Sequence, residues 1–335
     1  MRHSSGRTRR LRLNLILAGM LLMAAALAVA LGETSLSASQ IRSAFFEPLS
    51  APAQILWSIR APRMAAAALV GGALGLSGAV MQGLLRNPLA DPGVLGVSAF
   101  SGLAAAGVIA LGLTSVPGAV ETAALLGASV AGALLTLLAG RLAEPQTLIL
   151  FGVALSALGG AATALVFNLS PSPVTTAEVL SWLLGSVANR DWSDVARGLA
   201  PALPGAILCL VSAPGLSQLT LGEETAALSG LPMDRLRMAA VAGAALLTGA
   251  AVSVAGVIGF VGLAAPHLVR RSAHEDPART LVPSALAGAG LLVVADLAAR
   301  MIPSAEELKL GVVTALFGAP VFAVVAWRAA RSWRG

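Results

Sequence analysis

The chain has 335 residues, of which 57% are hydrophobic and 11% are charged, and its mean hydropathy is +0.84. A soluble protein of this length needs more polar surface, so the composition indicates an integral membrane protein. The net charge of +6 does not indicate a nucleic-acid-binding protein, because the arginines fall at the ends of apolar runs rather than along one polar face. Long apolar runs without alternating polarity favour membrane helices over a β-barrel.

The first expected element is a membrane helix at residues 13–31, which follows a basic N-terminal tail at residues 1–12. A basic stretch followed by an apolar one also begins a secretory signal peptide. The apolar run is long enough to span a membrane and lacks a convincing small-residue cleavage site. We therefore interpret it as an uncleaved first helix.

Nine further membrane helices are expected from the apolar runs that follow. They lie at residues 64–83, 93–112, 117–139, 146–168, 196–213, 238–256, 258–270, 281–300 and 310–327. The run at 258–270 is too short to cross a bilayer alone, so it is expected to form a broken or half helix. The predicted fold is an all-α integral membrane protein with about ten transmembrane helices in a single domain, residues 1–335.

The positions of the basic residues predict the orientation. If the N-terminus is cytoplasmic, about two thirds of the 22 Lys and Arg residues lie on the cytoplasmic side of the predicted helices. The five tryptophans also fall near predicted helix ends, where interfacial aromatic residues gather. Both signals favour a multi-pass protein with cytoplasmic termini.

The positions of the charged residues also indicate which energy sources could drive transport. Ion-coupled carriers usually place charged residues at mid-membrane, and none of the 16 acidic residues is clearly central in a predicted helix. A phosphate-binding loop ends in Gly-Lys-Ser/Thr, whereas the only lysine, Lys309, is followed by leucine. If ATP drives this protein, a separate subunit must hydrolyse it.

No cluster of reactive residues indicates an enzyme or a metal site. Cys209 is the only cysteine and lies in an apolar run, which favours a packed and inert thiol. The three histidines, at positions 3, 267 and 274, do not form a metal-binding pattern. An intramembrane enzyme is therefore disfavoured, and we expect no catalytic residue, no metal and no cofactor bound by this chain.

Four stretches occur in order along the chain: WSIRAPRMAAAALVGGALGLSGAVMQGLLRNPLADPGVLGVS, LGEETAALSGLP, GVIGFVGLAAPHLVRR and ELKLGVVTALFGAPVF. Together they resemble the FecCD-type permease family, the membrane subunits of binding-protein-dependent ABC importers for iron siderophores, haem and cobalamin. The resemblance implies the type II ABC importer permease fold, in a non-catalytic translocation subunit of the bacterial inner membrane. The implied partners are ATP-binding cassette ATPase subunits that use ATP and Mg, a periplasmic or lipid-anchored solute-binding protein, and a second permease. The second permease is expected as a further copy of this chain, in a homodimer, with a paralogue as the alternative.

Arg60, Arg63 and Arg300 are the candidate docking residues for the solute-binding protein. On residue type alone, Arg60 and Arg63 fit arginines that anchor a helix end at the membrane interface. The resemblance implies instead that all three receive glutamates of the binding protein. Guanidinium groups suit that role because they bind carboxylates in a bidentate geometry.

The stretch at residues 219–237 is the candidate coupling segment. Read from its residues alone, it is a polar connection with a short helix that is broken at Gly230 and Pro232, or a solvated loop. The resemblance implies that the segment contacts the ATPase subunit. The candidate contact residues are Glu223, Glu224, Ala227, Leu228 and Gly230.

The motif RNPLADPG, residues 86–93, is expected to form a cytoplasmic turn between two membrane helices. Pro88 and Pro92 would stop continuous helix there. A plain turn does not account for Asn87 and Asp91, for which we expect a contact with the ATPase side. The resemblance also implies that the fifth predicted helix, around residues 155–168, lines the transport pathway.

The function expected from these features is translocation of an iron-siderophore complex, with haem or cobalamin as alternative cargoes. The alternative of a different class is a stand-alone secondary transporter. Co-purification of an ATP-binding subunit would discriminate between the two classes.

Overall fold

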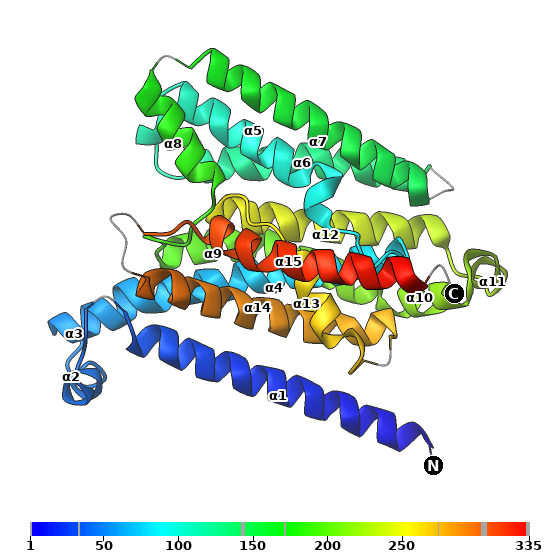
Figure 1. Ribbon diagram of the computed structural model, residues 1–335, viewed down its shortest axis with the longest axis horizontal. Helices are drawn as coiled ribbons and strands as arrows, with labels where there is room; N and C mark the ends of the chain where they lie inside the picture. The colour runs from blue at the N-terminus through cyan, green and yellow to red at the C-terminus, as the bar shows by residue number, and fades with distance from the viewer. Residues whose placement is uncertain are drawn as a thin grey trace.

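The computed structural model describes residues 2–32, 34–141, 145–170, 172–273, 275–302 and 307–332. Helices make up the regular structure of these ranges and run side by side as an elongated bundle (Figure 1). Their bounds are α1 Arg2–Ala30, α2 Ala38–Ser43, α3 Ala51–Gln54, α4 Ala61–Leu84, α5 Val97–Ala110, α6 Ala119–Ala139, α7 Pro145–Asn168, α8 Pro173–Leu183, α9 Trp192–Val211, α10 Ala213–Gln218, α11 Glu223–Leu228, α12 Met233–Ala255, α13 Val261–Arg270, α14 Pro277–Met301 and α15 Leu310–Ser332.

All ten predicted membrane segments correspond to helices: α1, α4, α5, α6, α7, α9, α12, α13, α14 and α15. Seven stretches within the described residues are long and apolar enough to cross a membrane. The helix α13 has only 10 residues, as expected for a half helix. The prediction of an all-α membrane bundle is confirmed.

Among the differences between the structure and the predicted boundaries, three concern α1, α4 and α8. The helix α1 starts at Arg2 rather than at residue 13, because the arginines and leucines of the basic tail are good helix formers. A π-helix at Ile55–Arg60 joins α3 to α4 without a break, so this helical stretch starts well before residue 64. The helix α8 was not predicted, because its 11 residues are too short to span a membrane.

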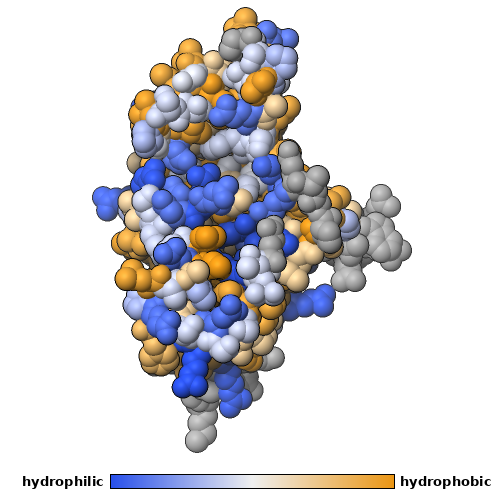
Figure 2. All heavy atoms as spheres, turned by 90° about the vertical axis from the view of Figure 1, so that its left-hand side faces the viewer, coloured by the Kyte–Doolittle hydropathy of each residue, from blue (hydrophilic) through white to orange (hydrophobic). Residues whose placement is uncertain are grey.

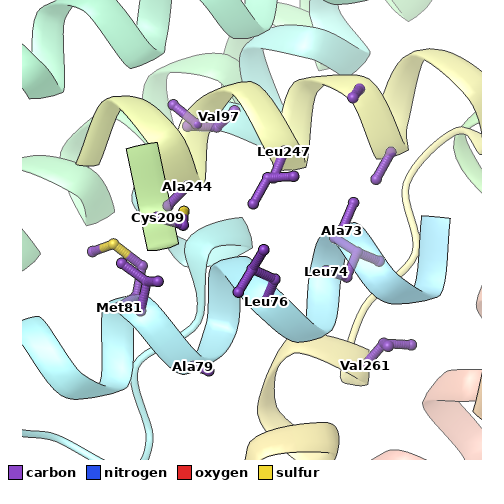
Figure 3. Close-up of a cluster of buried hydrophobic side chains, with 14 of the residues drawn as sticks. Ala73, Leu74, Leu76, Ala79, Met81, Val97, Cys209, Ala244, Leu247 and Val261 are labelled. Carbon is purple, nitrogen blue, oxygen red and sulfur yellow. The ribbon is translucent and has the colours of Figure 1, made fainter. Parts of the chain in front are cut away.

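The centre of the bundle is the packing of α4 against α12 and α14. A Cβ atom on Gly71 would lie 2.2 Å from the carbonyl oxygen of Gly288, so the α4 and α14 backbones touch. The small residues of α4 therefore allow the close backbone approach that stabilises helix pairs in lipid. Facing α12, Leu76 packs in a buried cluster with Leu247 and Cys209 (Figure 3).

The peripheral helices differ from this centre. In the apolar stretch of α1, 11% of the residues are buried within the chain, and in that of α7 the share is 22%. The corresponding values are 72% for the stretch that contains α4 and 78% for α12. Exposed apolar helix faces suit contact with lipid or with another subunit.

The two ends of the bundle carry different short elements. One end, which we call the α3 end, bears α2, α3 and the C-terminus of α1 (Figure 1). The opposite end, the α11 end, bears α10, α11 and the N-terminus of the chain. Figure 2 looks onto the α3 end, where hydrophilic residues gather over the middle of the face. A polar end face is what a bundle presents where it leaves the membrane.

Candidate functional site

Arg63 lies at the α3 end between two carboxylates. Its Nη2 donates to Asp296 Oδ1 over 2.7 Å and its Nε to the same oxygen over 3.1 Å. Its Nη1 donates to Glu307 over 3.0 Å, and Nη2 also pairs with Glu307. The Asp296 side chain is 2% exposed and that of Glu307 is 26% exposed, so the first is a buried partner and the second an accessible one.

Arg60 and Arg300 hold the C-terminal end of α1. Arg60 Nη1 donates to the carbonyl oxygens of Val29, over 3.1 Å, and Ala30, over 2.7 Å. Arg300 Nη2 donates to the carbonyl oxygen of Ala28 over 3.1 Å, and Arg300 Nε forms an ion pair with Asp296 at 3.3 Å. The last carbonyls of a helix have no intrahelical partner, so these arginines satisfy groups that would otherwise be unpaired.

The structure therefore brings the three predicted docking arginines into one group. We call Arg60, Arg63, Arg300, Asp296 and Glu307 the arginine cluster. Its two carboxylates were not identified as site residues from the sequence, because they lie 233 and 244 residues from Arg63. One signal was present for Asp296, which stands four residues before Arg300 on a helix, at the spacing of an ion pair.

A cavity of about 780 Å³ lies between α5, α7, α13 and the turn that precedes α5. From α7, which is the fifth predicted helix, the residues Ser156, Gly160, Thr163 and Phe167 line it. Most of its surface is apolar, and Asp91 is the one charged residue among the described lining residues. A weakly polar cavity of this size suits passage of a bulky solute without tight binding.

The structure explains Asn87 and Asp91, the two polar residues of the turn at residues 86–93 that a plain turn does not require. Asn87 Oδ1 accepts a hydrogen bond from the backbone N–H of Leu89 over 2.9 Å. Asp91 Oδ1 accepts from the N–H of Gly93 over 2.6 Å and thereby caps the short 3-10 helix Pro92–Leu95. Asn and Asp stabilise turns through bonds of this kind, and Pro92 fits the first position of the short helix.

Burial raises the pKa of the Asp91 carboxyl to about 6, and the hydrogen bond from the Gly93 N–H acts in the opposite direction. A carboxyl group in an apolar cavity wall favours its neutral form. Proton uptake by this group is therefore expected in mildly acidic solution.

The 219–237 segment contains the short helix that the sequence predicted. The helix α11 ends at Leu228, and Gly230 follows with φ of +82°, a backbone region that favours glycine. The Leu228 side chain is 90% exposed, and Ala227 and Glu224 are exposed as well. Glu223 forms an ion pair with Arg237 of α12 at 3.1 Å, so it ties the segment to the bundle rather than standing free.

A bundle of membrane-spanning helices with a large cavity between them, and with short helices at both ends, defines a multi-pass membrane permease. The sequence matches the FecCD transport family over residues 20–328, and the chain belongs to this family. It is therefore a permease of the ABC importers, and relatives of this type are membrane subunits rather than ATPases.

Three similar proteins illustrate the relationship. An uncharacterized ABC transporter permease protein, YvrB of Bacillus subtilis, is 43% identical over 84% of this chain and 80% of its own length. The vitamin B12 import system permease protein BtuC of Vibrio cholerae is 40% identical over 93% of this chain and 92% of its own. A solved inward-facing structure, assigned to the metal-chelate type of ABC transporter, is 31% identical with a TM-score of 0.84 over 95% of this chain and 99% of that one.

Proposed function

We propose that this permease imports a bulky metal chelate, with cobalamin as the first candidate cargo and an iron siderophore as the second. The observation that carries the proposal is the 40% identity, over nearly the whole chain, to a permease named for vitamin B12 import. The sequence alone favoured a siderophore, and the similarity to a transporter of metal-chelate type keeps that candidate. The wide and weakly polar cavity suits either cargo.

The cargo is tested on the solute-binding protein that co-purifies with the permease. Thermal unfolding of that protein is measured with cobalamin, haem and ferric siderophores, because a ligand raises the unfolding temperature according to its affinity. A shift with cobalamin alone supports the first candidate. A shift with a siderophore alone replaces it with the second.

The proposed assembly is a homodimer of permeases with two ATPase subunits, placed in the bacterial inner membrane. Its support is the exposed apolar surface of α7, which is available for a second copy, and the family to which the chain belongs. The α11 end would face the cytoplasm, because it carries the basic N-terminus, and the α3 end would face outward. ATP and Mg would act in the ATPase subunits. An active permease that purifies and transports without any ATPase would instead be a secondary transporter.

The arginine cluster is proposed as the docking site for the binding protein. Its three arginines and two carboxylates leave one net positive charge for an incoming glutamate. Arg63 is the arginine to test, since its partner Glu307 is accessible. Arg63→Glu should weaken binding of the loaded binding protein at least tenfold, an effect typical of a paired interface charge.

The control for this test is Arg42→Glu, an equal charge change at an exposed residue of α2 on the same end. Equal binding by both variants would contradict the docking role. Circular dichroism and the unfolding temperature of each variant show whether the bundle is intact.

The helix α11 is proposed as the main contact with the ATPase subunit, through Ala227, Leu228 and Gly230, with Glu224 beside them. Leu228→Asp should abolish stimulation of ATP hydrolysis by the loaded binding protein, because it places a charge in an apolar contact. The matched control is Leu49→Asp at the α3 end, where the leucine is 91% exposed. Unchanged stimulation in the Leu228 variant would disprove this contact.

The turn at residues 86–93 is proposed to support the α11 end where the ATPase subunit binds. Asn87→Ala combined with Asp91→Ala should loosen the turn, because each change removes one side-chain hydrogen bond to the backbone. Transport that survives the double change would reduce the motif to a dispensable turn. Pro88 and Pro92 would then serve only to end helical structure.

A further inference from the structure

A second, smaller cavity of about 180 Å³ lies at the α11 end, separate from the large one. It is formed by the C-terminal parts of α4 and α13, the first residues of α14, the turn after α4, and the 219–237 segment. Its polar lining residues are Gln82, Arg86, Thr220, Arg270, Glu275 and Thr280. Two arginines thus line a space that can hold one small anionic group.

The two arginines are held differently. Arg270 Nη2 donates to Gln82 Oε1 over 3.1 Å, and Gln82 Nε2 donates to the carbonyl oxygen of Gly262 over 3.4 Å. These bonds fix the Arg270 guanidinium between α4 and α13. Arg86 is exposed, its backbone has φ of +49°, and within the described part of the chain no hydrogen bond or ion pair engages its side chain. A fixed cation and a cation free to adapt therefore face the same space.

The charge of the cavity suits a carboxylate. Among its described lining residues, Arg86 and Arg270 oppose one acidic residue, Glu275, so the lining carries one net positive charge. Glu275 lies close enough to influence Arg270 electrostatically, but forms no ion pair with either arginine within the described residues. One added carboxylate would neutralise the lining, whereas a phosphate dianion would reverse its sign.

The location favours a protein side chain over a lipid headgroup. The walls come from α4, whose membrane stretch is 72% buried, and from Thr220, four residues before the exposed part of α11. The cavity is therefore an inner feature of the end face rather than part of the lipid-facing perimeter. Its volume leaves room for a carboxyl group and a few waters, since water takes up about 30 Å³ per molecule.

We propose that this cavity receives an acidic side chain of the ATPase subunit, with Arg86 and Arg270 as its two partners. The proposal rests on the assembly with an ATPase proposed above and adds a second contact beside α11. Guanidinium groups bind carboxylates in two-bond geometry, so the contact also orients the partner. The Arg270–Gln82–Gly262 bonds connect it to the transport cavity, because Gly262 lines that cavity.

Arg86→Glu tests the contact with the full-length permease in nanodiscs of neutral lipid, and with the ATPase subunit that co-purifies with it. The charge change should weaken ATPase binding at least tenfold, as for other interface ion pairs that are reversed. The matched control is Arg271→Glu, an exposed arginine on the same face that does not line the cavity. It should bind within about twofold of the unmodified protein, because exposed single charges contribute little.

A compensating charge change in the ATPase subunit identifies the acidic residue that enters the cavity. Each Asp and Glu on the facing surface of the ATPase is changed to Arg, and one of these changes should restore binding to the Arg86→Glu permease. Arg86→Gln, which removes the charge without reversing it, should give an intermediate loss. Unfolding temperatures of all variants show whether the fold is retained.

Other outcomes overturn the inference. Equal binding by the Arg86→Glu and Arg271→Glu permeases does so, and so does a rise in unfolding temperature with inorganic phosphate or with anionic lipid that requires Arg86. If Leu228→Asp weakens binding while Arg86→Glu does not, the proposed coupling role of α11 stands and only the cavity contact is wrong. If the unmodified permease binds no ATPase, both proposals are wrong.

Discussion

Arginines at the two ends of the bundle are held in opposite ways. At the α3 end, Arg60 and Arg300 are buried and Arg63 is partly buried, and all three contact carbonyl oxygens or carboxylates of the same chain. At the α11 end, Arg86 is exposed and unpaired within the described residues. The residue type is the same, so the neighbours decide whether an arginine stabilises the fold or is available to a partner. A docking role for the α3 end requires that an incoming carboxylate compete with Glu307.

Asp296→Ala gives the largest expected loss of stability. The change leaves Arg63 and Arg300 without their shared buried carboxylate, and breaking such a pair costs about 3–5 kcal/mol. The unfolding temperature in detergent measures this loss. Glu307→Gln is the control, because its more exposed pair is expected to contribute at most about 1 kcal/mol. Similar shifts in both variants would mean that the α3 end is not held together by buried charge.

Arg60→Met has the next largest expected effect. The methionine fills similar space but donates no hydrogen bond, so the last carbonyls of α1 lose a partner at about 1–3 kcal/mol. The expected result is faster proteolysis between α1 and α2, with a lower unfolding temperature. Arg42→Met on exposed α2 should change neither. Unchanged proteolysis in the Arg60 variant would show that α1 does not depend on this cap.

The sequence was sufficient to predict the helices that cross the membrane. Apolar runs of about 20 residues reflect the bilayer thickness, so α4, α12 and α14 could be found from local composition alone. The short helix α8 could not be found in this way, although Ser172 and Pro173 supply a capping residue and a first-turn proline. Apolar length is a signal for crossing the membrane and not for shorter helices.

The site residues were predictable in type but not in their contacts. Arg60, Arg63 and Arg300, which were predicted as one docking site, lie in one cluster, and their joint role stays a prediction. Their internal partners depend on the packing of α1 and α14 against α4, which residue spacing does not report. The hydrogen bonds of Asn87 and Asp91 span only two residues each and could have been inferred from their turn chemistry.

The stability of the α11 end should show a smaller, pH-dependent effect from Asp91. Its pKa is raised to about 6 in the folded protein, so the folded state holds this proton more tightly than the unfolded state. Stability from this group is fully present at low pH and is lost as pH rises toward about 6. Asp91→Asn should remove that decline. Unfolding temperatures measured across this range test it, and Asp234→Asn, at an exposed acid on the same end, should leave the decline in place.

The smallest expected effects come from the two neighbouring glutamates of α11, which repeat the contrast between paired and open charges within one helix. Glu223 is bound to Arg237, so Glu223→Gln should lower stability by at most about 1 kcal/mol. Glu224 is exposed, and Glu224→Gln should leave the unfolding temperature unchanged. If an exposed and unpaired charge contacts the ATPase subunit, the two variants rank the other way round in ATPase binding. Glu224→Gln then weakens ATPase binding more than Glu223→Gln does. The same order in both measurements would mean that internal pairing does not distinguish structural from contact residues at this end.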